Sequence, residues 1–143
     1  MLLGEYEHTI DEKNRLTLPA KFRRAFVDGI LLTRGTDGCI DAYTREEWAR
    51  RVEDRLAAHD ALSKDSRRLR RFVYSGAVEA ELDRQGRVMI PARLIEYAKL
   101  GHEVVVAGVH DHLEIWDRTA WREELAEVEG GAESAAERLA QRD

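Results

Sequence analysis

The chain has 143 residues, of which 43% are hydrophobic and 36% charged, with a formal net charge of −5. This composition predicts one compact unit with a real core and excludes a disordered chain. The negative balance excludes a nucleic-acid binder that relies on overall positive charge, so charge has to be read by segment.

The cysteine count and the hydropathy pattern indicate the redox environment of the protein and whether it associates with a membrane. Cys39 is the only cysteine, which excludes an internal disulfide and zinc sites built from several cysteines. We expect a reducing, cytoplasmic environment. The first residues lack the pattern of a signal peptide, and the longest apolar run, residues 104–109, is far short of the ~20 residues of a membrane span. We therefore expect no membrane association.

An internal repeat is the most informative feature of the sequence. Residues 10–20 read IDEKNRLTLPA and residues 82–92 read LDRQGRVMIPA, which aligns the aspartates, arginines and prolines of the two segments at an offset of 72. A second pair of blocks, IDAYTREEW at residues 40–48 and LEIWDRTAW at residues 113–121, follows in the same order. The chain therefore contains two copies of one structural unit.

In chain order, each copy predicts strand, turn, strand, helix, strand, strand. Alternating apolar residues favour the strands, and Asn14 and Gly86 suit the left-handed conformation of a tight turn. We expect the helices to begin at Pro19 and Pro91 and to end at Gly29 and Gly101. The predicted fold is thus α+β, with two pseudo-symmetric β-β-α-β-β modules at residues 5–47 and 76–119. A module of this size needs to share its core with the other.

Helical segments are predicted outside the two modules. Thr44 and Glu47 form a capping box before an apolar stripe in the connector, residues 48–75, and a break is expected near residues 63–65. Asp117 is predicted to cap a C-terminal helix within residues 120–143. We expect that helix to end at Gly130 and Gly131, followed by a frayed acidic tail.

Positive charge is concentrated at equivalent places in the two modules. Residues 13–24 and residues 84–95 contain basic side chains and no acidic ones. The connector residues 49–72 carry a net charge of +4, and residues 122–143 carry −4. The arginine run at residues 67–71 looks like a second DNA patch, but it can also be a solvated helix face or a contact with acidic residues of another subunit. We favour a solvated face or a subunit contact over DNA binding.

These motifs resemble the MraZ family of the AbrB/SpoVT-like swapped-hairpin DNA-binding group. The resemblance covers residues 1–121 and rests on the paired D-x-x-x-R motifs, their spacing and the LEIWD segment of the second copy. It implies an AbrB-like swapped-hairpin barrel and a bacterial transcription regulator that assembles into rings. It also implies binding to direct repeats in the promoter of the division and cell-wall gene cluster, which includes the regulator's own gene. Asn14, where the family usually has glycine, and residues 110–112 depart from the family pattern.

The D-x-x-x-R motifs are predicted to make the base-specific DNA contacts. Asp and Arg flank a three-residue turn, so the carboxylate can hold the guanidinium in one orientation for a guanine or a phosphate. The alternative is that each pair only stabilises its turn. We expect Arg15 to matter more than Arg87, because more basic residues lie near it in sequence. The predicted DNA-binding residues are Asp11, Lys13, Arg15, Lys21, Arg23, Arg24, Asp83, Arg84, Arg87 and Arg93.

Two other functions compete with DNA binding. His110, His112 and Glu114 fall on one short stretch and could form a catalytic zinc site, although no known catalytic motif accompanies them. A non-enzymatic oligomeric scaffold is the second alternative. We predict a non-enzyme with no cofactor, no metal and no small-molecule substrate, whose partners are promoter DNA and further copies of itself.

Overall fold

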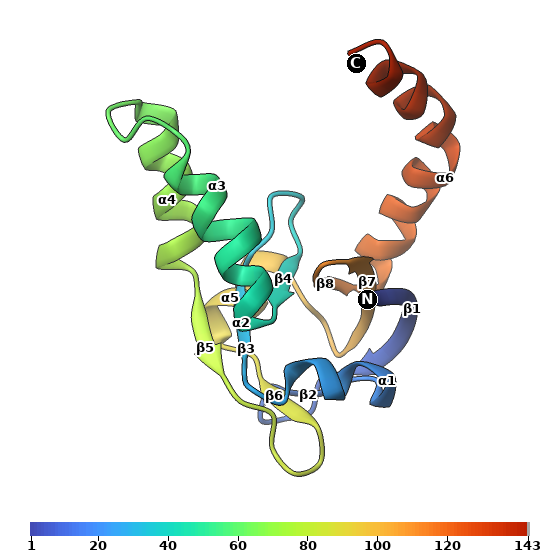
Figure 1. The fold of residues 1–143 in the computed structure, drawn as a ribbon. Coiled ribbons are helices and arrows are strands. Elements are labelled where there is room, and N and C mark those ends of the chain that lie inside the picture. Colours follow the sequence, from blue (N-terminus) through green and yellow to red (C-terminus); the bar gives the residue numbers. More distant parts are fainter. Residues whose placement is uncertain (143) are drawn as a thin grey trace.

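A computed structural model describes residues 1–142 as an α+β fold (Figure 1). Each repeat has the predicted order of two strands, a helical segment and two strands. The first repeat contains β1 (Leu2–Thr9), β2 (Arg15–Thr17), α1 (Ala20–Arg23), the 3-10 turn η1 (Arg24–Phe26), β3 (Ile30–Arg34) and β4 (Ile40–Tyr43). The second contains β5 (Val78–Ala80), β6 (Arg87–Met89), α5 (Ala92–Ala98), β7 (Glu103–His110) and β8 (Leu113–Asp117).

The strands of the two repeats are interleaved. One six-stranded sheet has the order β1-β7-β8-β4-β3-β5, and all of its pairings are antiparallel. The first strand of each repeat joins the other repeat, because β1 pairs with β7 and β5 pairs with β3. The second strands, β2 and β6, pair with each other in a separate two-stranded ribbon.

This pairing differs from a local hairpin within each repeat. In the first repeat, the strands flanking the turn meet only at an isolated bridge between Ile10 and Leu16. Pairing of β1 with β7 is favoured over pairing with β2 because β7 pairs with β1 along all of Leu2–Thr9. Gly108 permits the close approach, since a Cβ there would lie 2.6 Å from the backbone of Leu2 and Leu3.

The two repeats bury one common core, as the size of each predicts. Leu16 and Phe22 of the first repeat and Val88 and Ile90 of the second are at most 1% exposed and belong to one cluster. Burial of a side chain such as Phe22 contributes about 1.5–3 kcal/mol relative to exposure. The ribbon and the large sheet are therefore held together by side chains of both repeats.

Helix boundaries depart from two expectations. Pro19 and Pro91 stand at the N-cap, one residue before the helices begin, where their extended ψ of 135° and 142° fits. The helix α5 ends at Lys99, whose φ of 53° is left-handed, and so not at Gly101 as predicted. The early end turns Leu100 against the core, a contact that commonly accompanies such a cap.

The connector forms two helical arms. The first runs through α2 (Arg45–Glu47), the π-helical η2 (Trp48–Glu53) and α3 (Asp54–Ala57), and the second is α4 (Lys64–Ser75). The predicted cap is present, since Glu47 N–H donates to Thr44 Oγ1 at 3.1 Å. The break covers residues 58–63, slightly earlier than expected, because Ser63 caps α4. The predicted stripe of Trp48, Val52 and Leu56 packs with β3 and β4 in a second cluster.

The C-terminal helix is longer than predicted. Asp117 caps it as expected, but α6 (Arg118–Ala140) continues through Gly130 and Gly131. Neither glycine adopts the left-handed conformation of a helix end, and the Ala-, Glu- and Arg-rich residues 132–140 favour helix. The helix extends away from the sheet and has no buried residue (Figure 1). Within residues 1–142, no helix is both long and apolar enough to cross a membrane.

Candidate nucleic-acid interface

The loop at residues 11–15 is organised by Asp11. Its Oδ1 accepts the backbone N–H groups of Lys13 and Arg15, both at 2.9 Å, and its Oδ2 accepts Arg15 Nε at 2.8 Å. Asn14 takes the left-handed conformation, with φ of 60°. The backbone N–H of Arg15 lowers the pKa of Asp11 and the Arg15 side chain lowers it further, so the carboxylate stays ionised at neutral pH.

The loop at residues 83–87 repeats this geometry atom for atom. Asp83 Oδ1 accepts the N–H groups of Gln85 and Arg87 at 2.9 Å, and Oδ2 accepts Arg87 Nε at 2.7 Å. Gly86, with φ of 75°, replaces Asn14. The predicted meeting of Asp and Arg across each turn is confirmed. In both loops Nε is the arginine atom held by Asp, and within residues 1–142 the protein provides no hydrogen bond to either pair of terminal guanidinium nitrogens.

The ribbon joins the two loops into one surface. In the register of β2 and β6, Arg15 lies opposite Met89 and Thr17 lies opposite Arg87. Leu16 and Val88 form the central pair and point into the core, with no exposed surface. Because side chains alternate along a strand, the two arginines share the outer face with Thr17 and Met89, and Met89 is 60% exposed. We call these four residues the ribbon face.

Sequence reasoning missed Thr17 and Met89, and it expected two separate loops. The alternation of β2 and β6 was visible, but their pairing was not, because nothing local in the sequence shows that the second strands of the two repeats meet. The backbone reinforces the pairing symmetrically: Leu18 N–H donates to Gly86 O at 2.9 Å, and Ile90 N–H donates to Asn14 O at 2.7 Å. Each loop is therefore fixed by the strand of the other repeat.

The remaining predicted residues surround the ribbon unequally. Arg23 donates from Nε to Leu18 O at 3.0 Å and packs on the second loop, where a Cβ on Gly86 would lie 2.3 Å from that same Nε. Arg23 belongs to the first basic window in sequence but to the second loop in space. Arg23, Arg84 and Asp83 line a cavity of about 290 Å³.

The first loop has a more open neighbourhood. Lys13 and Arg15 line a groove of about 690 Å³ with Ile95 and His102 of the second repeat. Lys21 lies 5.6 Å from the Tyr6 ring centroid, and Arg24 is exposed on η1. Arg93 lines a different cavity with Phe72 and Tyr97. The structure therefore brings Arg15, Arg87 and Arg23 to the ribbon and its loops, and gives Arg93 separate surroundings.

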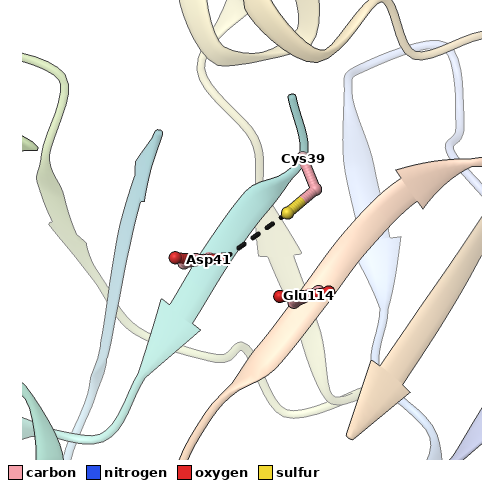
Figure 2. Close-up of side chains that lie close together, drawn as sticks. All are labelled: Cys39, Asp41 and Glu114. Atoms are coloured by element: carbon pink, nitrogen blue, oxygen red, sulfur yellow. Dashed lines mark hydrogen bonds between the residues drawn. The ribbon is translucent and has the colours of Figure 1, made fainter. Parts of the chain in front are cut away.

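The alternative set of metal ligands is not assembled as the sequence suggested. His110 is exposed, with φ of 83°, whereas His112 Nε2 lies 3.7 Å from Glu114 Oε2. Within residues 1–142, the group of three possible ligand atoms that lie within 4.8 Å of one another is Cys39, Asp41 and Glu114 (Figure 2). Cys39 and Asp41 occupy the positions of the first repeat that match His112 and Glu114 of the second. The sequence did not predict that these matched positions meet in space.

Comparison with known proteins identifies close relatives. A family model described as "MraZ protein, putative antitoxin-like" matches residues 1–72 and again residues 73–143. A "Transcriptional regulator MraZ" of Roseiflexus castenholzii (strain DSM 13941 / HLO8) is 42% identical over 141 residues, covering 99% of this chain and 98% of the relative. The protein of the same name from Thermoanaerobacter pseudethanolicus (strain ATCC 33223 / 39E) is 44% identical over 139 residues, covering 97% and 96%.

Proposed function

The chain belongs to the MraZ family, and we propose that it is a non-enzymatic, sequence-specific DNA-binding transcriptional regulator that reads double-stranded promoter DNA with its ribbon face. The relatives are named transcriptional regulators, and the family model matches both repeats. The observation that carries the proposal is the pair of Asp-held arginines on one exposed two-stranded ribbon.

A two-stranded ribbon fits the major groove, where each base pair presents a distinct pattern of donors and acceptors. Guanine accepts two hydrogen bonds from one guanidinium at O6 and N7. Asp11 and Asp83 bind Nε, which leaves the terminal nitrogens of Arg15 and Arg87 to make that contact. The aspartates therefore act by orienting the arginines. Thr17 and Met89 lie beside them and are suited to contact the methyl groups of thymine.

The other basic residues position the protein on the DNA backbone. We assign phosphate contacts to Lys13 and Arg84 in the loops, to Lys21, Arg23 and Arg24 near α1, and to Arg93 on α5. Phosphate contacts fix register and orientation without reading sequence. They also make affinity fall with salt, because each one releases counterions from the DNA.

The strand exchange between the repeats supports an AbrB-like swapped-hairpin barrel as the fold of the two modules, residues 5–47 and 76–119. Self-association completes the proposal. The connector helices carry net positive charge and the C-terminal segment, residues 120–143, net negative charge, so α4 of one copy can face α6 of the next. A head-to-tail contact of this kind closes into a ring where its rotation permits.

A ring would present several ribbon faces to spaced direct repeats and raise their effective concentration without new contacts. The DNA target we propose is the promoter of the division and cell-wall gene cluster, including the protein's own gene, where binding represses transcription. This activity places the protein in the cytoplasm, associated with the nucleoid.

The proposal is tested by a mobility-shift assay on the DNA upstream of the protein's own gene, with a scrambled sequence of equal length as the control. We expect a shifted complex that excess scrambled DNA does not displace. Its affinity should fall steeply with salt and should also fall when one direct repeat is removed. An oligomeric protein that shifts neither DNA would be a scaffold, and one that shifts both DNAs equally would bind DNA without reading its sequence. Either result would contradict the proposal.

A further inference from the structure

One face of the β4–β8 pair gathers four side chains with metal-binding atoms. Asp41 and Glu114 are direct partners across these strands. Cys39 immediately precedes β4 and His112 immediately precedes β8, and the contacts of both side chains place them beside Asp41 and Glu114. Cys39 and Asp41 belong to the first repeat, and His112 and Glu114 belong to the second.

Three of the donor atoms, from Cys39, Asp41 and Glu114, lie within 4.8 Å of one another, and His112 stands beside them. Cys39 Sγ lies 3.5 Å from Asp41 Oδ1. His112 Nε2 lies 3.7 Å from Asp41 Oδ1 and 3.7 Å from Glu114 Oε2. These three separations are close to the edges of a tetrahedral zinc site, roughly 3.3–3.8 Å for metal–ligand bonds of 2.0–2.3 Å. His112 lies outside the group of mutually close donor atoms, so binding of one ion by all four residues requires the His112 ring to turn toward Cys39. Figure 2 shows Cys39 and Asp41 on one strand, with Glu114 on the neighbouring strand beside them.

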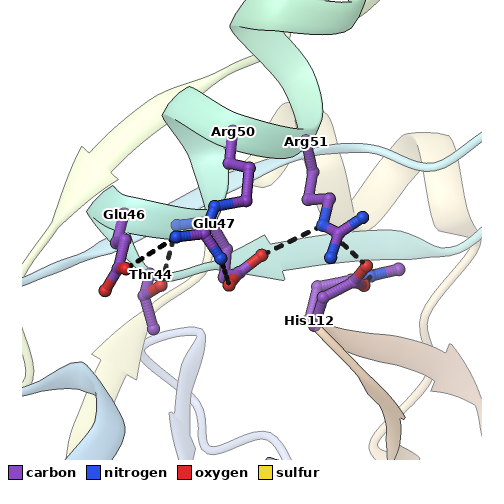
Figure 3. Close-up of polar contacts among 7 residues, drawn as sticks. Thr44, Glu46, Glu47, Arg50, Arg51 and His112 are labelled. Carbon is purple, nitrogen blue, oxygen red and sulfur yellow. Dashed lines mark hydrogen bonds and ion pairs between the residues drawn. The ribbon is translucent and has the colours of Figure 1, made fainter.

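The orientation of His112 is fixed from its other side. Its Nδ1 lies 2.6 Å from Asp111 Oδ1, and its ring stacks on Tyr43 with centroids 4.7 Å apart. Arg51 Nε holds the second oxygen of Asp111 at 3.3 Å, and Figure 3 shows Arg51 reaching toward His112 from the connector helix. A histidine that binds metal through one nitrogen usually has the other held by a carboxylate in this way.

Glu114 is oriented as well, because its Oε1 accepts Trp116 Nε1 at 3.0 Å. This leaves the other oxygen, Oε2, toward His112. The donor set is mixed, with one sulfur, one nitrogen and two carboxylates. It therefore suits a borderline divalent ion such as Zn²⁺ rather than Mg²⁺ or Ca²⁺, which prefer oxygen alone.

The two carboxylates of this face lie against each other. Asp41 and Glu114 are directly opposite on paired strands, where like charges repel. A cation bound between them offsets this repulsion. A cavity of about 260 Å³ between β3, β4 and the connector helices reaches Asp41, and Arg34, Arg51 and Arg55 also line it.

We propose that Cys39, Asp41, His112 and Glu114 bind one Zn²⁺-type ion that joins β4 of the first repeat to β8 of the second. Four protein ligands leave no open coordination position, so the ion has a structural role and not a hydrolytic one. Its binding stabilises the folded chain, since the unfolded chain does not hold these ligands together. The site is independent of the ribbon face and of the proposed DNA binding.

The test is calorimetric titration of Zn²⁺ into tag-free, metal-free chain kept reduced, in a buffer without imidazole. We expect one ion per chain. Cys39→Ser and His112→Gln should each weaken that binding at least tenfold, whereas His110→Ala, which removes a nearby exposed histidine, should not. Co²⁺ in place of Zn²⁺ should give a thiolate-to-cobalt absorption band that Cys39→Ser abolishes.

Glu114→Gln distinguishes loss of a zinc ligand from loss of folding. It retains the oxygen that accepts Trp116 Nε1 and removes only the charge of the ligand. We expect its circular dichroism to match the wild type and its zinc affinity to fall at least tenfold. In the wild type, zinc should raise the melting temperature, and in Cys39→Ser it should not. Absence of stoichiometric zinc uptake, or uptake unchanged in both Cys39→Ser and Glu114→Gln, would overturn the proposal and leave an ion-pair network between the strands.

Discussion

The loops at residues 11–15 and 83–87 share a backbone and an Asp–Arg contact but differ in what surrounds them. Glu12 and Lys13 of the first loop offset each other in charge, whereas Arg84 and Gln85 stand at the same positions of the second. Arg23 packs on Gly86 of the second loop, and the first loop faces the wider groove beside Ile95. The first repeat therefore contributes an arginine to the loop of the second. Among the described residues, those of the second repeat that line the groove of the first loop include no lysine or arginine.

This asymmetry revises the expectation that Arg15 matters more than Arg87. That expectation counted charges along the sequence, and the strand exchange moves Arg23 to the other loop. The two otherwise equivalent loops thus differ in their surroundings: the second loop has more positive charge around it, and the first loop faces the wider groove. The loops should then contribute unequally to affinity, although we propose that both contact bases.

The largest effect on DNA affinity is expected from removing both loop arginines. A bidentate arginine–guanine contact is worth about 1–3 kcal/mol, so the double variant Arg15→Ala/Arg87→Ala should lose about 30-fold or more in affinity for specific DNA. Of the single variants, Arg87→Ala should lose more than Arg15→Ala. Fluorescence anisotropy with operator DNA measures both.

Both arginine side chains are roughly a quarter exposed, at 29% and 27%, and form contacts within their own loops, so the melting temperature should change little. Variants that unfold instead of losing affinity would favour the reading in which the Asp–Arg pairs only stabilise their turns. Equal losses for the two single variants would remove the asymmetry.

Exchanging the turn residues should have the next largest effect. Gly86→Asn gives the second loop the residue of the first, but its Cβ would meet Arg23 Nε and break the hydrogen bond to Leu18 O. The expected loss of stability is about 0.5–1.5 kcal/mol, that of one hydrogen bond. Asn14→Gly is the reverse exchange. Glycine adopts the left-handed conformation of this position without steric cost, so stability should be nearly unchanged. Urea unfolding of the two variants decides the matter, and similar losses in both would contradict the placement of Arg23.

A double-mutant cycle sharpens the assignment of Arg23. Arg23→Ala should lower the salt dependence of DNA binding by about one phosphate contact. Combined with Arg87→Ala, its effect on affinity should be non-additive by at least about 0.5 kcal/mol, because the two side chains share one loop. Combined with Arg15→Ala it should be additive. The reverse pattern in the same cycle would assign Arg23 to the first loop.

The smallest effect concerns pH. The pKa values of Asp11 and Asp83 are lowered by the N–H groups of Arg15 and Arg87. A carboxylate with a lowered pKa stabilises the fold above its unfolded pKa, near about 4, and loses that contribution as the pH falls through its folded value. Stability should therefore be unaffected by these groups between pH 5 and pH 7 and should decline below about pH 4. Carboxyl chemical shifts in an NMR titration, with Asp11→Asn and Asp83→Asn to assign them, would show whether both loops titrate alike.

Local chemistry and a core shared by the repeats were predictable from the sequence, but the individual contacts between the repeats were not. The Asp–Arg contact, the Thr44 cap and the buried stripe from Trp48 depend on residues a few positions apart, and all are present. The pairing of β2 with β6 and the position of Arg23 depend on segments about 70 residues apart, which no local pattern encodes. For the same reason, the repeat alignment matches Asp41 with Glu114 but does not show that the two residues pair across β4 and β8. The end of α6 was missed for another reason, since helix formers after Gly131 outweighed two glycines.

Methylation protection of operator guanines tests the central claim that the two loops read bases as one face. Dimethyl sulfate attacks guanine N7 in the major groove, the atom that Arg15 and Arg87 are proposed to bind. We predict that the wild type protects guanines on one groove face of each direct repeat, that Arg15→Ala exposes some of them, and that Arg87→Ala exposes others close by. Protection that neither variant alters, or no protection at any guanine within a bound repeat, would contradict the account.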